Sequence, residues 1–172
     1  MATRTIPARL SRYNIYDTTR GTSKPLGVAT VTLPSIKALS DTLSGAGVLG
    51  EIDLPTLGQF GSMETEIEWN TISGEAVSLA PGVSKELTFR GEMQTVTGEG
   101  IIQMTGCRVV VKGVCKNLDL GSAENGAATG TTTSMECFYI KVVIGGKDKF
   151  ELDKLNSVYR VNGRSMLDNS LI

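Results

Sequence analysis

Three glutamates alternate with apolar residues in the segment 63–70, and paired carboxylates are the groups that hydrolyse glycosidic bonds in most glycosidases. In an extended strand, Glu64, Glu66 and Glu68 share one face and lie about 7 Å apart, a spacing compatible with paired catalytic acids. Such pairs normally come from different strands around a concave pocket, whereas three carboxylates on one strand form a solvated or channel-facing stripe. The sequence therefore favours a stripe over a catalytic pair.

Other groups with known chemistry are sparse. Histidine is absent, which removes the commonest general base and the commonest ligand of catalytic zinc. The glycine-rich run at residues 45–50 lacks the Lys-Ser/Thr ending of a phosphate-binding loop, and no helix is predicted after it. Cys107 and Cys115 would lie roughly 26 Å apart in an extended chain, too far for a disulfide, so with Cys137 they are expected to be buried, reduced thiols. We expect no enzyme, no cofactor and no metal site.

The length and charge balance of the chain indicate one soluble domain. At 172 residues it can bury roughly two thirds of its unfolded surface, so a single domain over residues 1–172 is expected. No apolar run approaches the roughly 20 residues of a membrane helix, and the start of the chain lacks the apolar core of a secretory signal, which favours a cytoplasmic origin. With a net charge of −1 and no basic block, tight binding of nucleic acid is not expected.

Apolar residues recur mostly with period two, and valine, isoleucine and threonine are abundant, so we predict a mainly β protein. The last two predicted strands should form a hairpin at Gly145-Gly146, because adjacent glycines allow the positive φ angles of a tight turn. One apolar face of this hairpin is predicted to contain Phe138, Ile140, Val142 and Ile144. The strands are expected at residues 26–33, 63–70, 86–94, 101–111, 135–144 and 149–155.

Three segments interrupt the predicted strands. Ser73 is a suitable N-cap for one short helix through residues 75–80, which Pro81-Gly82 should end. Residues 40–61 and 121–133 lack periodicity and are predicted to be loops. The first loop is long and carries apolar side chains that are costly to expose, so we expect a neighbouring subunit to cover them. These side chains are Val48, Leu49, Ile52, Leu54, Leu57 and Phe60.

Several short motifs follow one another along the chain in an order and spacing typical of one protein family. Near the C-terminus they are Gly146-Lys147, Glu151-Leu152-Asp153, Leu155-Asn156 and Arg160-Val161-Asn162-Gly163. Upstream they are Val31-Thr32-Leu33-Pro34, Gly45-Ala46-Gly47, Met63-Glu64, Trp69, Phe89-Arg90-Gly91 and Val109-Val110-Val111-Lys112-Gly113. From about residue 13 to the end, the chain resembles the major tail tube protein of contractile-tailed bacteriophages and of the related R-type bacteriocins.

The resemblance implies a β-sandwich or β-barrel tail-tube fold, whose strands join between subunits into a ring-wide inner β-barrel. It implies hexameric rings that stack into the inner tube of a contractile tail or tail-like particle, a conduit for DNA or ions that performs no catalysis. The implied partners are further copies of the chain, the tail sheath protein, and the baseplate, tape-measure and terminator proteins. DNA would pass without specific binding, the subunit alone would not insert into a membrane, and the particle would be assembled in the bacterial cytoplasm.

Two sets of polar residues are candidates for the wall of such a bore. The wall of a DNA conduit should be neutral or acidic, because lysine and arginine contacts to phosphate slow transit. One candidate is the acidic stripe of Glu64, Glu66 and Glu68. The other is an uncharged polar alternation formed by Thr95, Thr97, Gln103 and Thr105.

Other functions fit parts of the pattern. A secretion-system tube protein would share the ring architecture but move protein effectors, and neighbouring genes for a sheath and a tape measure would favour the phage tube. A monomeric carbohydrate-binding β-sandwich needs a cluster of exposed aromatics, which one Trp, four Tyr and four Phe supply poorly. A carboxylate enzyme is the third interpretation, under which Glu66→Gln would abolish hydrolase activity.

Overall fold

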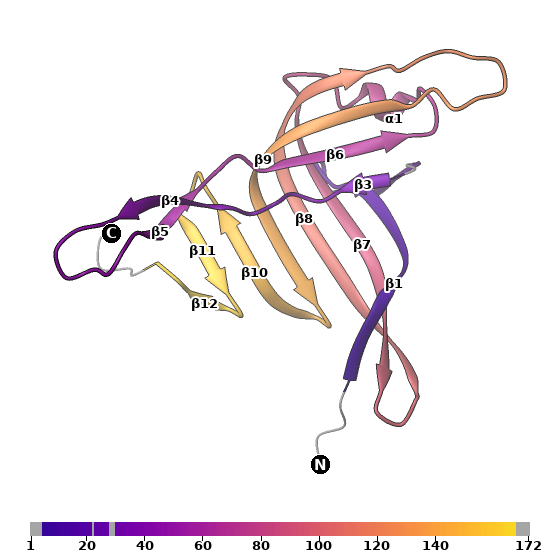
Figure 1. The fold of residues 1–172 in the computed structure, drawn as a ribbon. Helices are drawn as coiled ribbons and strands as arrows, with labels where there is room; N and C mark the ends of the chain where they lie inside the picture. Colours follow the sequence, from indigo (N-terminus) through magenta and orange to yellow (C-terminus); the bar gives the residue numbers. More distant parts are fainter. Residues whose placement is uncertain (1–4, 22, 28–29, 168–172) are drawn as a thin grey trace.

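The computed structural model describes residues 5–21, 23–27 and 30–167. It is mainly β with one short helix, which confirms the expected fold class (Figure 1). No helix in these ranges is long and apolar enough to cross a membrane. The elements are β1 (Thr5–Asp17), β2 (Lys24–Leu26), β3 (Thr30–Thr32), β4 (Ala38–Leu43), β5 (Ile52–Phe60), β6 (Glu64–Trp69), α1 (Gly74–Val77), β7 (Ser84–Thr97), β8 (Ile102–Asp119), β9 (Thr131–Ile144), β10 (Lys147–Asp153), β11 (Val158–Val161) and β12 (Arg164–Ser165).

A long antiparallel sheet runs through the whole molecule in the strand order β12-β11-β10-β9-β8-β7-β1-β2. Its middle strands are the longest, because β7, β8 and β9 have 14, 18 and 14 residues. The described strands do not close on themselves, so a single subunit forms an open sheet and no complete barrel. We refer to this assembly of strands as the long sheet.

A second layer, formed by β3 and β6, lies over one face of the long sheet (Figure 1). The first half of β9 pairs with β6, from Glu136 opposite Glu64 to Thr131 opposite Trp69, while the second half pairs with β10. One edge of β9 therefore carries two different strands, and the chain folds back over β1, β7 and β8. We call β3 and β6 the cover layer, and the face of the long sheet turned away from it the outer face.

The hydrophobic core lies between the two layers. Trp69 is the largest fully buried side chain, and its Nε1 donates a hydrogen bond of 3.0 Å to Thr133 Oγ1, which satisfies the polar edge of the ring. Thr65 and Ile67 are also buried in the cover layer, as the alternation in residues 63–70 predicts. The facing side of the long sheet contributes Ile15, Leu87, Phe89, Val109, Val111 and Ile140.

The β9–β10 hairpin forms at Gly145-Gly146 as predicted, with φ angles of 57° and 75°. Its predicted apolar face is wrong in detail. The register of β8 and β9 shifts so that Lys112 pairs with Tyr139 and Gly113 with Cys137, which leaves Phe138 as an additional residue. Because this bulge reverses the alternation, the core side of β9 changes from odd-numbered residues before Phe138 to Ile140 and Val142 after it.

Two strand and loop predictions also fail. The single strand expected at residues 26–33 is split into β2, which pairs with β1, and β3, which pairs with β6, while residues 28–29 lie outside the described residues. Residues 40–61 are not a loop but lie mostly in the antiparallel hairpin β4–β5. Both faces of this hairpin are largely exposed, so its sequence lacks the alternation that marks a half-buried strand.

The remaining predictions hold with small changes. Ser73 caps α1 by accepting a hydrogen bond from the backbone N–H of Ala76, although the helix ends at Val77 rather than Ala80. The predicted loop at 121–133 is confirmed up to residue 130, after which β9 begins. Cys115 and Cys137 are buried free thiols whose pKa is raised by burial, whereas Cys107 is a half-buried free thiol.

Candidate assembly surfaces

The acidic stripe lies on the exposed side of β6, away from the core. Lys116 donates a hydrogen bond of 2.8 Å to Glu64, and this contact lowers the pKa of the Glu64 carboxyl. A general acid needs a raised pKa, so the environment of Glu64 is the opposite of a catalytic one. Glu66 and Glu68 are exposed beside it. The structure thus keeps the three carboxylates on one wet face, as their spacing predicts.

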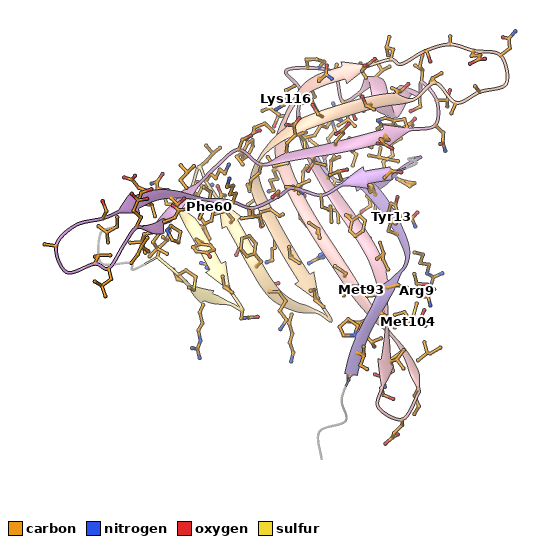
Figure 2. All side chains as sticks on the ribbon, viewed as in Figure 1. Arg9, Tyr13, Phe60, Met93, Met104 and Lys116 are labelled. Atoms are coloured by element: carbon orange, nitrogen blue, oxygen red, sulfur yellow. The ribbon has the colours of Figure 1, made fainter. Side chains whose placement is uncertain are left out.

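The β4–β5 hairpin projects from the body of the molecule (Figure 1). Only its base is anchored, because Phe60 packs against Tyr159 with ring centroids 5.0 Å apart and Gly61 donates its N–H to the carbonyl of Lys37. Phe60 is therefore half-covered by its own subunit (Figure 2). Val48 near the tip is half-buried, and the other predicted contact residues are exposed: Leu49, Ile52, Leu54 and Leu57.

The hairpin is acidic as well as apolar. Residues 38–60 contain Asp41, Glu51 and Asp53 and no lysine or arginine. Asp41 pairs with Leu54, and Leu43 pairs with Ile52, so these four side chains share one face of the hairpin. Asp53 pairs with Thr42 and belongs to the opposite face. An uncovered apolar surface of this kind is typical of a protein–protein contact.

The uncharged polar set lies where β7 and β8 extend beyond the core. Thr95 is directly opposite Gln103, and with Thr105 it continues the side of the long sheet that the cover layer occupies further up. Thr97 is buried at the turn, where its hydroxyl accepts a hydrogen bond from the N–H of Ile101. The structure therefore brings these four residues together, but on a different element from the acidic stripe.

Exposed apolar residues at this projecting end are not among the sequence-based candidates. Figure 2 places Met104 and Arg9 there, close to the β7–β8 turn. The periodicity gave little signal, because adjacent apolar residues such as Ile101 and Ile102 fit neither face of a half-buried strand. The exposed members are Ile6, Leu10, Ile101, Ile102 and Met104, each between 44% and 61% exposed.

Both ends of the long sheet are open edges. Strand β2 pairs with β1 only through Ile15, Tyr16 and Asp17, so residues 5–14 of β1 have a neighbouring described strand, β7, on one side only. At the other end, β12 pairs only with β11. Unpaired N–H and C=O groups along an edge bind the strand of another chain readily. The subunit therefore offers two edges for extending the sheet.

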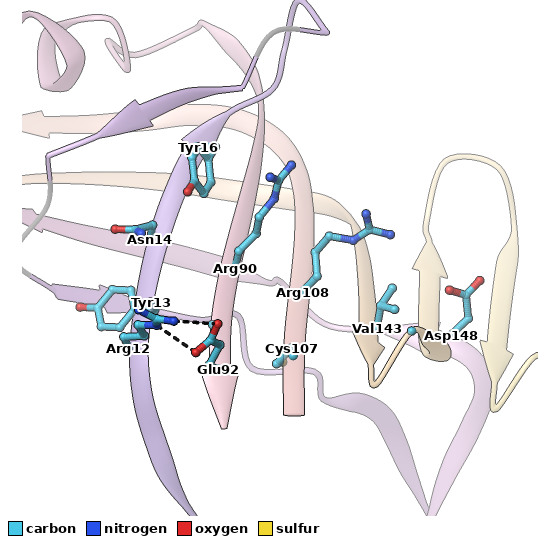
Figure 3. Close-up of a pocket in the computed structure, with 13 residues that line it drawn as sticks. Arg12, Tyr13, Asn14, Tyr16, Arg90, Glu92, Cys107, Arg108, Val143 and Asp148 are labelled. Atoms are coloured by element: carbon cyan, nitrogen blue, oxygen red, sulfur yellow. Dashed lines mark hydrogen bonds and ion pairs between the residues drawn. The ribbon is translucent and has the colours of Figure 1, made fainter. Parts of the chain in front are cut away.

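A groove crosses the outer face of β1, β7 and β8 (Figure 3). Arg12 and Glu92 form a two-point ion pair at one end of it, with a shortest distance of 2.9 Å. Arg90 and Arg108 extend side by side from adjacent strands, and the guanidinium of Arg90 lies 4.8 Å from the ring centre of Tyr16. The groove is thus lined by polar and cationic groups that no element of the described subunit covers.

Comparison with known proteins identifies a family whose members match over nearly the whole chain. A family described as phage tail tube protein FII matches residues 7–170. The tail tube protein of Escherichia phage P2 is 27% identical over 173 residues, which cover 95% of this chain and 94% of that protein. The major tail tube protein of Serratia phage KSP20 is 22% identical over 167 residues, covering 97% of this chain and 95% of that protein. The protein is therefore a structural component of a phage virion, not an enzyme, and belongs to the phage tail tube protein FII family.

Proposed function

We propose that this chain is the subunit of the inner tube of a contractile phage tail or of a phage-tail-like R-type bacteriocin. Hexameric rings of the chain stack into a tube whose bore conducts DNA, or ions in the bacteriocin. The observation that carries this proposal is an open long sheet with an unpaired edge at each end, in a chain of the tail tube family. A soluble monomer has little use for two such edges, because they invite aggregation.

In the proposed ring, the edge of β1 in one subunit continues the sheet of the next subunit near β11 and β12. Repetition of this contact around the ring produces one inner barrel without free edges. The cover layer is too bulky to share a narrow bore with the opposite side of the ring, so its position relative to the wall determines how wide the bore is. Closure replaces backbone hydrogen bonds to water with hydrogen bonds between subunits.

The β4–β5 hairpin is the proposed contact between subunits. Its apolar residues Leu49, Ile52, Leu54 and Leu57 are exposed in the subunit and are buried when the hairpin docks on a neighbour. Burial of apolar surface contributes roughly 25 cal/mol for each Å², so these side chains supply a substantial part of the driving force for assembly. Val48 and Phe60 support the hairpin from its tip and its base.

Two candidate surfaces for the bore wall remain proposals. The acidic stripe of Glu64, Glu66 and Glu68 repels the phosphates of DNA, and Thr95, Gln103 and Thr105 stay wet without holding phosphate. Thr97 belongs to the same strand end but is buried in its turn. Either surface lets DNA pass without specific binding.

The proposed partners are further copies of the chain, the sheath that surrounds the tube, the baseplate on which it begins, the tape-measure protein inside it and the terminator at its end. Assembly takes place in the bacterial cytoplasm, before the particle leaves the cell. The names of the two phage relatives support the tail tube role.

Electron microscopy of the purified protein and of its parent particle tests this proposal. We expect rings or tubes with six-fold end views, and the chain should be present along the whole tail. A chain that stays monomeric at high concentration and is missing from the tail would overturn the proposal. A sheath around the tube in the parent particle distinguishes a contractile tail from other tails.

A further inference from the structure

We infer that the outer face of β1, β7 and β8 is the surface that receives the β4–β5 hairpin of another copy, with Arg90 and Arg108 binding the carboxylate of Asp41. This inference rests on the proposed tube function, because it names the acceptor surface for the contact between subunits. Four observations support it: unsatisfied charge, adjoining apolar side chains, a complementary hairpin face and the positions of the two surfaces.

The first observation concerns the charges on the outer face. Most cationic side chains there are matched by a carboxylate on a neighbouring strand: Arg12 with Glu92 at 2.9 Å, Lys112 with Glu86 at 3.0 Å, Lys141 with Asp148 at 2.8 Å and Arg160 with Glu151 at 3.3 Å. Within the described ranges, Arg90 and Arg108 are without such a carboxylate. The outer face therefore carries an unbalanced positive charge at one place.

Arg90 and Arg108 are direct cross-strand neighbours, which is unfavourable for two like charges. Arg90 is held by Tyr16 and by a 3.3 Å hydrogen bond to Ser23 Oγ, so its guanidinium is positioned without a counter-ion. A carboxylate placed between the two guanidiniums removes the repulsion and forms charge-assisted hydrogen bonds. The pair is thus arranged as a receptor for an anionic group from outside the subunit.

The second observation is that exposed apolar residues continue this face away from the arginines. In the unbroken register of β7 and β8, Arg90, Gln94 and Val96 share the face with Arg108, Met104 and Ile102. Ile6 of β1 is opposite Val96 and lies on the same face. Met104, Ile102 and Ile6 are 50%, 61% and 49% exposed. The acceptor surface therefore has a cationic part and an apolar part.

The third observation is that the hairpin presents the same two parts with matching charge. Its apolar face carries Asp41 beside Leu54, followed by Leu43 and Ile52 and then by the exposed Leu49 at the tip. The hairpin has no cation that repels Arg90 or Arg108. When Asp41 lies at the arginines, the apolar side chains toward the tip fall on Met104, Ile102 and Ile6.

The fourth observation is the position of the two surfaces, because the hairpin and the projecting end of β7–β8 lie at opposite ends of the molecule (Figure 1). A contact between two different surfaces of identical subunits is heterologous, and its repetition closes into a ring or continues as a helix. Each subunit thus gives one hairpin and receives one. This is the arrangement that a ring or a stack of rings requires.

A charge exchange tests the contact. Arg108→Glu and Asp41→Arg should each raise the protein concentration needed for half-maximal assembly at least tenfold, as measured by sedimentation velocity. The double variant Arg108→Glu with Asp41→Arg should restore assembly toward the wild-type value. The matched control is Arg108→Glu with Asp53→Arg, which has the same composition of charges but alters the other face of the hairpin and should not restore it.

Disulfide trapping provides an independent measurement that does not rely on loss of assembly. In a Cys107→Ser background, Leu43→Cys together with Met104→Cys should give a ladder of covalent oligomers under mild oxidation. Asp53→Cys with Met104→Cys should give at least tenfold less. Near-UV circular dichroism of each variant at low concentration establishes that the subunit remains folded.

The outcomes separate this inference from the proposed function. Wild-type tubes combined with unaffected assembly of Arg108→Glu and no disulfide ladder would overturn the inference and leave the tube function in place. A wild-type chain that forms no rings would contradict the tube function itself. If Arg108→Glu reduced binding of duplex DNA while assembly stayed normal, the arginines would be a phosphate contact and the inference would be wrong.

Discussion

The ion pair between Lys85 and Asp17 has the least exposed side chains of any ion pair in the described chain, at 15% and 18%. Burial raises the pKa of Asp17, but hydrogen bonds from Lys85 and Thr19 outweigh this effect, so its pKa lies below the ordinary value of 3.8. A carboxyl group with a lowered folded pKa stabilises the fold above its unfolded pKa. That contribution is lost as the pH falls through the folded value.

We expect Asp17→Asn to reduce the free energy of unfolding by about 1.5–3 kcal/mol at pH 7, the range for a hydrogen bond to a charged group. The difference from wild type should shrink once the pH falls below 3.8, because the wild-type carboxyl is then protonated as well. Urea unfolding at several pH values measures this difference. Asp148→Asn, which removes the more exposed pair with Lys141, is the control and should cost at most about 1 kcal/mol. A cost of Asp17→Asn that is the same at every pH would contradict this account.

At the scale of the elements, Gly113 allows the two central strands to approach each other. It stands where the register of β8 and β9 shifts, and a Cβ atom there would collide with the backbone carbonyl of Glu136. The bulge at Phe138 depends on this approach, and through it the side chains of β9 that reach the core. The requirement is for a small residue and not for an unusual φ angle, because Gly113 is not among the glycines with positive φ.

Gly113→Ala should therefore reduce the free energy of unfolding by about 1–3 kcal/mol or more, as overpacking in a closed site does. Gly106→Ala is the matched control in the same strand, because a Cβ atom there meets no atom within 4 Å. Denaturant unfolding followed by far-UV circular dichroism compares the two variants. Equal effects would show that the close approach of β8 and β9 is not what requires glycine.

The elements also show which predictions from sequence succeed. The alternation in β6, the glycine turn between β9 and β10 and the Ser73 cap each depend on a few neighbouring residues, and all three are present as predicted. The β4–β5 hairpin was missed because neither of its faces is buried within the subunit, so nothing in the sequence alternates.

At the scale of the whole molecule, the hairpin makes little contribution to the fold of its own subunit. Its tip contacts no part of the core, while its base is fixed by Phe60 against Tyr159. Segments with few buried contacts open locally at low cost, without unfolding the core. Stability and assembly therefore depend on different parts of this chain.

Replacing residues 44–51 with Asn-Gly, a sequence that favours a two-residue hairpin turn, separates these two properties. The shortened chain should unfold within about 0.5 kcal/mol of wild type, since surface changes away from packed sites rarely cost more. It should nevertheless fail to form rings or tubes at concentrations where the wild type assembles. Urea unfolding and sedimentation velocity measure the two effects. A large loss of stability would show that the hairpin tip belongs to the folded core.

The sequence by itself determined the β class, the wet glutamate face of β6, the turn at Gly145-Gly146 and the resemblance to tail tube proteins. These features are local, or are carried by motifs in a fixed order along the chain. Only the tertiary structure decided that residues 40–61 form a projecting hairpin, that Phe138 reverses the alternation of β9, and that Arg90 and Arg108 stand unpaired beside an apolar surface. Each of these depends on which distant strands pair and in which register, and pairing is fixed by contacts that no short stretch of sequence contains.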